Sequence, residues 1–599
     1  MSTRLFHLSA RFCPEGRLED QGGAGLIFDR HLAVEAANLH PPARHYQAGG
    51  CDLVVWGNPI VDGQIDDRAV LRLFEGAADT AAFARALDGS FLILLRDPAR
   101  RTFSVISDRF GSLAVYWRMD QGVLSLSTSF KSILDGLMRE QRARLKPEAI
   151  FEFLHFRRLF GTHTFEADTV YLDSASVLSY GPGQSEPSVT KYWQPSFAPT
   201  PLKGKALAAE LADGLHAAMD SHMSDDRRFG LMLSGGLDAR ALLAAAPRPP
   251  VCFTTCLTRN NEFEVAAELA RGAGAEHIFV ERPKDMLNDV VDDCVWLAGM
   301  QIYPEFQFAP YGPAVLPKAD SIFLGLALDV FFAGLYLPKR PRRVLGRETL
   351  MYALKPLGDD LPGAFMNGVS YRLKTSSPWS IVKDGARAGL EESLRASVGG
   401  VMAHGKDLGA DSYGQWEYMH LHNFSRHYSF PMAASIRGYA DCRIPALTNR
   451  LFDLAFAMQP EDKANWAVYQ QAIDLCDPAM MSVRNANTNI RASRSLAAQT
   501  AIHFARAAAK RVIGNRFRSL PPWWERSWPP ASHSIEHNPR IREMVSALTD
   551  SPRLDSLGFL DPAKIRSAVA EHQAGTRDHS VMLNMLVTVD RCLTPRAVP

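Results

Sequence analysis

The spacing of apolar and polar residues changes twice along the chain. Up to about residue 195, short runs that favour β-strands are separated by Asp, Gly and Pro, and this pattern predicts a mainly β region. Three of the expected strands are Ser90–Arg96, Thr102–Ser107 and Leu113–Trp117. A proline-rich stretch at 195–201 follows and predicts a linker.

From Gly204 onward, apolar runs alternate with helical patterns. The expected helices cover 204–223, 240–246 and 262–272, and the expected strands cover 229–233, 251–257, 277–280 and 321–324. Such alternation indicates a parallel sheet with helices on both faces. Beyond residue 345, periodic segments such as Ala446–Met458 and Pro562–Ala574 predict a mostly helical part.

Composition narrows the class of protein. A chain of 599 residues is too long for a single core, and 46% hydrophobic with 22% charged residues is typical of a globular protein. The net charge of +1 gives no reason to expect nucleic acid or a membrane surface as a partner. Eight cysteines without a Cys-x-x-Cys motif, and a first segment without an apolar signal region, predict a cytoplasmic protein without structural zinc. The apolar stretch 321–338 carries Asp329 in its middle, so we expect a buried strand and a turn rather than a membrane span.

The most specific local motif is the segment Ser234-Gly235-Gly236-Leu237-Asp238, between an expected strand and an expected helix. Glycines at such a junction let backbone N–H groups approach a phosphate, and the start of the helix favours an anion. The Ser234 hydroxyl can add a hydrogen bond, and the Asp238 carboxylate can hold Mg²⁺. The alternative is a Gly-Gly turn without a ligand. Met232 in place of glycine excludes the serine-hydrolase elbow, and the Walker pattern is absent.

Two further segments follow expected strands of the same sheet. Thr254-Thr255 belongs to the next strand, and Gly325-Leu326-Ala327-Leu328-Asp329 closes the strand 321–324. Ligands of parallel α/β sheets lie beyond the carboxyl ends of the strands. We therefore expect Asp238 and Asp329 to share one magnesium–pyrophosphate unit.

With these pieces placed, the chain resembles the asparagine synthetase family over nearly its whole length. The matching segments occur in the family's order: Leu87-Asp88-Gly89-Ser90-Phe91, Asp108-Arg109-Phe110-Gly111 with Tyr116, Ser129–Leu134, Lys191-Tyr192-Trp193, the loop 234–238, Glu262 with Ala266, Ala270 and His277, and Ile436-Arg437 with Arg443-Ile444-Pro445.

The resemblance implies two domains. Residues 1–195 would form a glutaminase-like αββα sandwich of the Ntn-hydrolase type, and residues 204–599 an ATP-pyrophosphatase domain with a parallel sheet and a helical extension. ATP and Mg²⁺ would be the cofactors. The resemblance places ATP on Leu233, Ser234, Gly235, Gly236, Leu237, Asp238, Thr255 and Gly325, with Asp238 and Asp329 as metal ligands and as catalytic residues.

Three departures from the family pattern bear on function. Ser2 and Thr3 stand where family glutaminases have Cys-Gly, so we expect no glutamine hydrolysis. Leu326 stands where relatives have Glu or Tyr, and its side chain cannot accept a proton. Trp466 aligns with a family lysine and Gln470 with an arginine of the same helix, which leaves Lys463, one turn earlier, as the candidate catalytic lysine.

A chain with the ATP loop and without the glutaminase cysteine resembles β-lactam synthetase, carbapenam synthetase and lasso-peptide cyclases. These relatives activate a carboxylate as its adenylate and close a ring with an amine of the same substrate. The absence of tyrosine at Leu326 and the long region 335–415 favour a peptide substrate and a lasso-type macrolactam, with a leader-peptide-binding protein or a protease as a partner. The alternatives are an ammonia-using asparagine synthetase or amidotransferase, and a nucleotide-binding pseudoenzyme.

Overall fold

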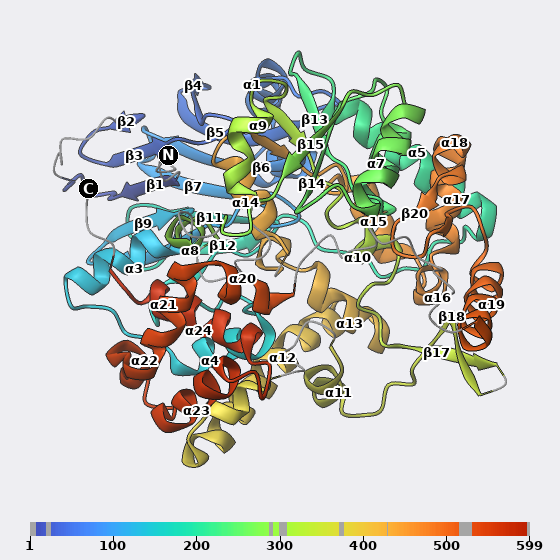
Figure 1. Cartoon of the computed structure of the whole chain (residues 1–599). Helices are drawn as coiled ribbons and strands as arrows, with labels where there is room; N and C mark the ends of the chain where they lie inside the picture. The colour runs from blue at the N-terminus through green and yellow to red at the C-terminus, as the bar shows by residue number, and fades with distance from the viewer. Residues whose placement is uncertain are drawn as a thin grey trace.

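The computed structural model describes residues 7–18, 25–286, 291–298, 308–344, 346–369, 376–427, 429–513 and 530–595. Its N-terminal part contains two six-stranded antiparallel sheets (Figure 1). The first has the order β10-β8-β9-β1-β3-β2 and the second β12-β11-β7-β6-β5-β4. The strands are β1 His7–Phe12, β2 Ile27–Phe28, β3 Leu32–Ala37, β4 Arg44–Ala48, β5 Cys51–Ile60, β6 Asp88–Asp97, β7 Thr102–Ser107, β8 Tyr116–Asp120, β9 Val123–Ser127, β10 Val170–Tyr171, β11 Ser176–Tyr180 and β12 Ser188–Lys191.

The two sheets pack face to face, with helices on their outer faces. Alternate side chains such as Phe12 of β1 and Phe103 of β7 meet between the sheets, with ring centroids 5.2 Å apart. Helices α1 (Asp67–Gly76) and α2 (Thr80–Ala86) cover the second sheet. On the first sheet, Tyr116 points outward to Phe130 of α3 (Phe130–Arg139), at 5.5 Å. These four layers confirm the predicted αββα sandwich.

A five-stranded parallel sheet forms the centre of the second part. Its order is β15-β14-β13-β16-β19, so β13 lies between β14 and β16. The strands are β13 Phe229–Met232, β14 Val251–Cys256, β15 His277–Glu281, β16 Ser321–Phe323 and β19 Asp441–Arg443, and helices α5 Gly204–His222, α6 Asp238–Ala245 and α7 Asn261–Gly272 accompany them. The predicted parallel α/β sheet is confirmed. The chain leaves β13 toward β14 on one side and enters β16 on the other, which creates a crevice at the carboxyl ends of β13 and β16.

The structure corrects two predicted elements. Strand β8 starts only at Tyr116. The preceding residues Leu113 and Val115 fill the space between the sheets, and the Val115 carbonyl oxygen accepts a 2.8 Å hydrogen bond from Leu172 N–H, next to β10. The stretch after β16 contains a short helix, α10 (Leu328–Phe332), and not only a turn. Ala327 begins it with a φ of 80°, which redirects the chain within a few residues. None of the described helices is both long and apolar enough to cross a membrane.

The C-terminal part is mostly helical, as the periodicity predicts. Helix α15 spans Asn449–Ala457 and is a few residues shorter than the expected helix 446–458, whereas α23 spans Pro562–Gln573, close to its expected bounds. Other long helices are α12 Arg387–Asp407, α13 Ser412–Leu421, α19 Leu496–Ile513 and α24 Ser580–Cys592. A hairpin of β17 (Lys339–Val344) and β18 (Arg347–Leu354) lies at the periphery beside α16 (Pro460–Ala464) and α19 (Figure 1).

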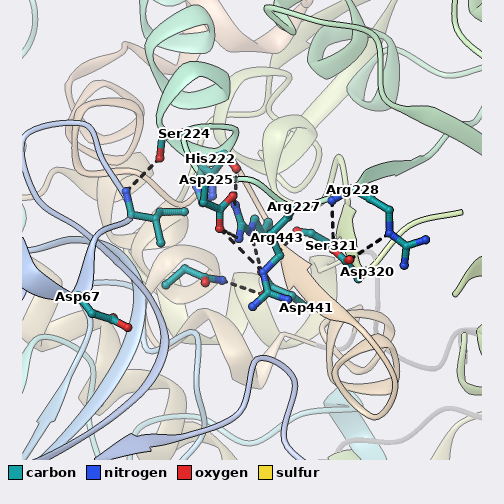
Figure 2. Close-up of polar contacts among 12 residues, drawn as sticks. Asp67, His222, Ser224, Asp225, Arg227, Arg228, Asp320, Ser321, Asp441 and Arg443 are labelled. Carbon is teal, nitrogen blue, oxygen red and sulfur yellow. Dashed lines mark hydrogen bonds and ion pairs between the residues drawn. The ribbon is translucent and has the colours of Figure 1, made fainter. Parts of the chain in front are cut away.

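A buried polar cluster joins the parallel sheet to the N-terminal sandwich. Figure 2 shows Arg443 of β19 between Asp225 and Asp441, with Nη2–Oδ2 and Nε–Oδ2 distances of 2.6 and 2.7 Å. Asp441 also accepts a 2.8 Å hydrogen bond from Asn58 Nδ2 of β5. Because Arg443 and Asp441 are almost wholly buried, each charge depends on the other for compensation. The cluster therefore fixes the position of β19 relative to β5.

His222 at the end of α5 makes this junction sensitive to acid. Burial, with a smaller contribution from Arg443, lowers the pKa of His222 to about 3, while Asp441 acts in the opposite direction. The folded protein therefore keeps the imidazole neutral below pH 6.5, where the unfolded chain binds a proton. Between pH 7.5 and 5.5 this group alone should reduce the free energy of unfolding by about 1.4 kcal/mol.

Urea denaturation at the two pH values measures this effect. The variant His222→Leu should show a loss between pH 7.5 and 5.5 that is smaller by about 1.4 kcal/mol. His503→Leu, at an exposed position of α19, is the matched control and should keep the pH dependence of the unsubstituted protein. Equal pH dependence in all three proteins would contradict the assignment.

Candidate active site

The predicted phosphate loop connects β13 to α6, as the sequence motif suggests. Gly235 N–H donates a 2.7 Å hydrogen bond to Glu262 Oε1 of α7, and Gly236 N–H approaches Ser234 Oγ at 3.3 Å. A Cβ on Gly235 would lie 2.4 Å from the Cβ of Ala486, so only glycine fits there. Glu262 thus braces the loop from the neighbouring helix, and α6 begins at Asp238.

The residues predicted to lie near adenosine occupy the ends of β13 and β14. The Leu233 carbonyl accepts a 2.8 Å hydrogen bond from Thr254 Oγ1, which also lies 2.9 Å from His277 Nε2. The Thr255 carbonyl accepts a 3.1 Å hydrogen bond from Arg282 Nη2. The structure therefore brings Leu233 and Thr255 together at one edge of the sheet. Their contact with a nucleotide remains a prediction.

Asp238 and Asp329 lie close together in the crevice between β13 and β16. Burial raises the pKa of Asp238 well above its usual range, the nearby Asp329 raises it further, and a 2.9 Å hydrogen bond from Tyr469 Oη lowers it. Burial raises the pKa of Asp329 to about 6. Hydrogen bonds from backbone N–H groups, chiefly that of Val330, act in the opposite direction and lower it. Neither carboxylate forms an ion pair within the described part of the chain. Two partly buried carboxylates without a cation suit a divalent ion.

These observations fit the predicted magnesium site. Asp238 and Asp329 would hold the ion, and the remaining oxygen ligands would come from phosphates and water, because the described residues contain no group of three or more metal-ligating acidic, His or Cys side chains. Bound there, Mg²⁺ would neutralise the charge of the two carboxylates and of pyrophosphate. Ser2 lies outside the described residues.

Gly325 allows the end of β16, which leads to Asp329, to approach Asp238. A Cβ at this position would lie 2.7 Å from both the Ala239 N and the Asp238 C atoms, which belong to the backbone and cannot yield easily. We expect Gly325→Ala to reduce the free energy of unfolding by about 1–3 kcal/mol through overpacking. Urea denaturation measures this, and Gly358→Ala is the control because its Cβ would meet no atom within 4 Å. Equal stability of the two variants would contradict the close approach.

The structure does not bring Lys463 to the carboxylates. Lys463 Nζ lies 2.6 Å from Glu417 Oε1 of α13 and 2.6 Å from the Ala455 carbonyl oxygen, and its side chain is fully buried. Trp466, with a φ of 59°, separates α16 from α17 (Ala467–Cys476), so Lys463 and Gln470 belong to different helices. This break corrects the single helix implied by the family spacing. A catalytic role of Lys463 remains a prediction that no described contact supports.

Two residues that the sequence interpretation missed hold the site together. Tyr469 of α17 reaches Asp238 from a segment 231 residues away. Arg240 of α6 is fully buried and donates to the carbonyl oxygens of Met480, Val483 and Arg484 at 3.0, 3.0 and 2.9 Å. No local motif identifies Tyr469 or Arg240. For Arg240 the sequence offers one signal: an arginine stands two residues after Asp238 in an otherwise apolar helix.

A cavity of about 650 Å³ lies between the N-terminal sandwich and helices α12 and α13. Asp173 at its wall lies 2.8 Å from Lys191 Nζ and 3.0 Å from His422 Nε2. Burial alone would raise the pKa of Asp173. His422 and Lys191 outweigh this effect and hold the pKa of Asp173 well below its usual range. The charges therefore compensate one another across the contact between the two parts of the chain.

Part of the chain is similar in sequence to asparagine synthetases. Residues 210–468, which include the loop and both carboxylates, match the asparagine synthase family. A putative glutamine-hydrolysing asparagine synthetase of Mycobacterium bovis is 25% identical over 397 residues, 57% of this chain and 58% of that protein. Glutamine-hydrolysing asparagine synthetase 1 of Bacillus subtilis is 22% identical over 285 residues, 46% of this chain and 44% of that protein.

The chain thus spans about 58% of the length of the first of these relatives. A solved structure of glutamine phosphoribosylpyrophosphate amidotransferase from B. subtilis, complexed with ADP and GMP, covers 46% of this chain and 75% of its own, with 8% identity and a TM-score of 0.21. Residues 210–468, less than half of the chain, are therefore similar to the asparagine synthase family.

Proposed function

We propose that the protein is an ATP-dependent ligase that activates a carboxylate as its adenylate, releases pyrophosphate and transfers the acyl group to an amine. The observation that carries this proposal is the pair Asp238 and Asp329 at the carboxyl ends of β13 and β16, which form no ion pair within the described residues. The phosphate loop beside the pair would receive the pyrophosphate part of ATP. The match of residues 210–468 to the asparagine synthase family supports the same chemistry.

The chain's own residues would act mainly by positioning. Tyr469 orients Asp238 through the 2.9 Å hydrogen bond, and Glu262 holds the loop at Gly235. Aligned reactants in a closed crevice need little further chemistry for attack by an amine on an adenylate. Leu326, packed against the core, supplies no proton acceptor.

Two substrate classes fit this ligase. A peptide that carries both the carboxylate and the amine would give a macrolactam of the lasso type, and the long region 335–415 supports this reading. Aspartate with free ammonia is the second class, and the relatives named asparagine synthetase support it.

Exchange of labelled pyrophosphate into ATP tests the activation step. The panel contains L-aspartate and linear peptides with a free amine and a side-chain or terminal carboxylate. We expect exchange with at least one member, dependent on Mg²⁺, and the active member distinguishes the two substrate classes. If no member supports exchange while nucleotide still binds, the protein is a nucleotide-binding pseudoenzyme and the ligase proposal fails.

A further inference from the structure

The cavity of about 650 Å³ between the N-terminal sandwich and helices α12 and α13 is large enough for a small organic molecule. The described residues that line it include none from the phosphate loop 234–238 or from α10, so the cavity is separate from the crevice. The sandwich side consists of the start of α4 (Pro147–Phe156), the loop 160–163, Asp173 and Lys191. Helix α4 lies beside α12, which forms the other wall together with α13 (Figure 1).

Mostly small side chains on α12 keep this cavity open. The residues of α12 that line it are spaced so that they share one face of the helix; they include Ser393, Ala396, Ser397, Gly400 and His404. In contrast, Leu390, Leu394 and Val398 of the same helix pack into the core. A Cβ on Gly400 would meet no atom within 4 Å. A larger side chain at this position would therefore occupy the cavity.

Buried contacts hold the loop 160–163 in place. The first N–H of the loop donates a 2.6 Å hydrogen bond to Glu152 Oε1. Arg426, which is 1% exposed, donates to the carbonyl oxygens of Gly161, at 2.8 Å, and of His163. The guanidinium group of the helical part thus fixes the wall that the sandwich contributes. Such a preformed wall lowers the entropy lost when a ligand binds.

The enclosed acidic group of the lining already has partners. Asp173 Oδ2 lies 2.8 Å from Lys191 Nζ, and Asp173 Oδ1 lies 3.0 Å from His422 Nε2. His422 Nδ1 in turn lies 3.1 Å from Tyr418 Oη. Glu148, the other acidic residue that lines the cavity, is exposed to solvent. The acidic groups therefore leave the enclosed part of the cavity without an uncompensated negative charge among the described residues.

The other polar groups of the lining can donate hydrogen bonds. Ser397 Oγ is buried and has no hydrogen-bond partner in the described part of the chain. Lys146 forms no ion pair with any described residue. It precedes α4, whose N-terminal end lies at the cavity without a side-chain cap and favours an anion. Further groups that can donate are the hydroxyls of Thr162 and Ser393 and the imidazoles of His163 and His404.

We propose that this cavity binds a small organic molecule that carries a carboxylate or a phosphate group. An oxyanion accepts hydrogen bonds and donates none, so it complements a lining whose unengaged groups are donors. Lys146 and Ser397 Oγ would bind the oxyanion, and the start of α4 would add to its stabilisation. The bound molecule would contact the sandwich and α12 together, and would stabilise the folded protein by binding it.

Isothermal titration calorimetry of the full chain tests the site, with inorganic phosphate, glycerol 3-phosphate, succinate and citrate as separate probes. EDTA in the buffer removes Mg²⁺ and with it the metal-dependent binding expected at Asp238 and Asp329. We expect at least one oxyanion to bind with a Kd of about 1 mM or lower, and the tighter probes decide between phosphate and carboxylate. Glycerol, the neutral probe, should not bind. Absence of binding by all four oxyanions, or equal binding of glycerol, would overturn the proposal.

Two substitutions with matched controls locate the bound probe. Gly400→Phe should abolish binding because its ring occupies the cavity, whereas Gly389→Phe should retain binding, since this exposed glycine of α12 lies outside the lining and its Cβ would also meet no atom within 4 Å. Lys146→Met should weaken binding by about 10-fold or more, the loss of a hydrogen bond from a charged group. Lys406→Met, at an exposed position of α12, should leave the affinity unchanged.

Unchanged affinity in Gly400→Phe would place the probe elsewhere and refute the site. Unchanged affinity in Lys146→Met would contradict the recognition of an oxyanion.

Modification of histidines by diethyl pyrocarbonate, read by mass spectrometry, provides a local measurement. The tightest probe should protect His404 and leave His503, at an exposed position of α19, reactive. Equal labelling of His404 with and without the probe would show that the cavity is not occupied. None of these measurements uses ATP or a ligase substrate, so their outcome is independent of the function proposed above.

Discussion

Asp238→Asn is expected to abolish pyrophosphate exchange and, at the same time, to stabilise the protein in the absence of ligands. The carboxylate lies partly buried beside Asp329, and both burial and the like charge raise its pKa. Asparagine retains an oxygen that can accept the Tyr469 hydrogen bond and removes the repulsion. We expect a gain of about 1–3 kcal/mol in the free energy of unfolding at pH 8, the range typical of relieving a buried polar group that lacks compensation.

The expected loss of pyrophosphate exchange in Asp238→Asn comes from the missing negative charge. A neutral amide is a poor ligand for Mg²⁺, which prefers charged oxygens, so the loop would no longer hold the metal-bound pyrophosphate. Exchange should fall by about 1000-fold or more, on the scale at which single electrostatic contacts matter in catalysis. The stabilisation of the unsubstituted protein by Mg²⁺ with an ATP analogue should also disappear in the variant.

Urea denaturation with and without Mg²⁺ and the analogue, together with the exchange assay, measures both effects. Leu326→Ala is the matched control, because Leu326 follows the same strand as Asp329 and contributes packing. It should lower the free energy of unfolding by no more than about 2–3 kcal/mol and retain exchange. Wild-type exchange in Asp238→Asn would remove the metal-site assignment, and a less stable unliganded variant would contradict the repulsion between the two carboxylates.

The strands and the loop could be predicted because their signals are local. The run that becomes β13, the two glycines and Asp238 are contiguous, and alternation of strands with helices determines where their carboxyl ends meet. The partnership of Asp238 with Asp329 followed from the same topological rule, although 91 residues separate them.

The supporting contacts could not be predicted, because they depend on how distant helices return to the crevice. Tyr469 and Arg240 support the site through side chains whose partners lie in other segments. The break between Lys463 and Gln470 could not be predicted for a related reason. The positive φ of Trp466 separates the two helices, and a non-glycine residue in this conformation gives no sequence signal.

Arg240→Met is expected to produce the largest loss of stability among the substitutions considered, about 3–5 kcal/mol, because three carbonyl oxygens lose their hydrogen-bond donor. The guanidinium group of Arg240 is wholly enclosed, and burial lowers its pKa to about 10. Its hydrogen bonds to Met480, Val483 and Arg484 satisfy carbonyl oxygens at the end of α18 (Pro478–Ser482) and in β20 (Arg484–Asn485). Methionine fills a similar volume but donates no hydrogen bond, so these buried acceptors would lose their partner.

The same substitution should weaken the phosphate loop, because the segment held by Arg240 continues to Ala486, which packs against Gly235. Urea denaturation and binding of a fluorescent ATP analogue measure the two consequences, and we expect both stability and affinity to fall. Arg271→Met, at an exposed position of α7, is the matched control and should change the free energy of unfolding by less than about 0.5 kcal/mol. Arg240→Lys should give an intermediate loss, since one ammonium group cannot reproduce the planar set of donors. A variant Arg240→Met as stable as the control would show that the buried arginine does not connect α6 to the segment 480–486.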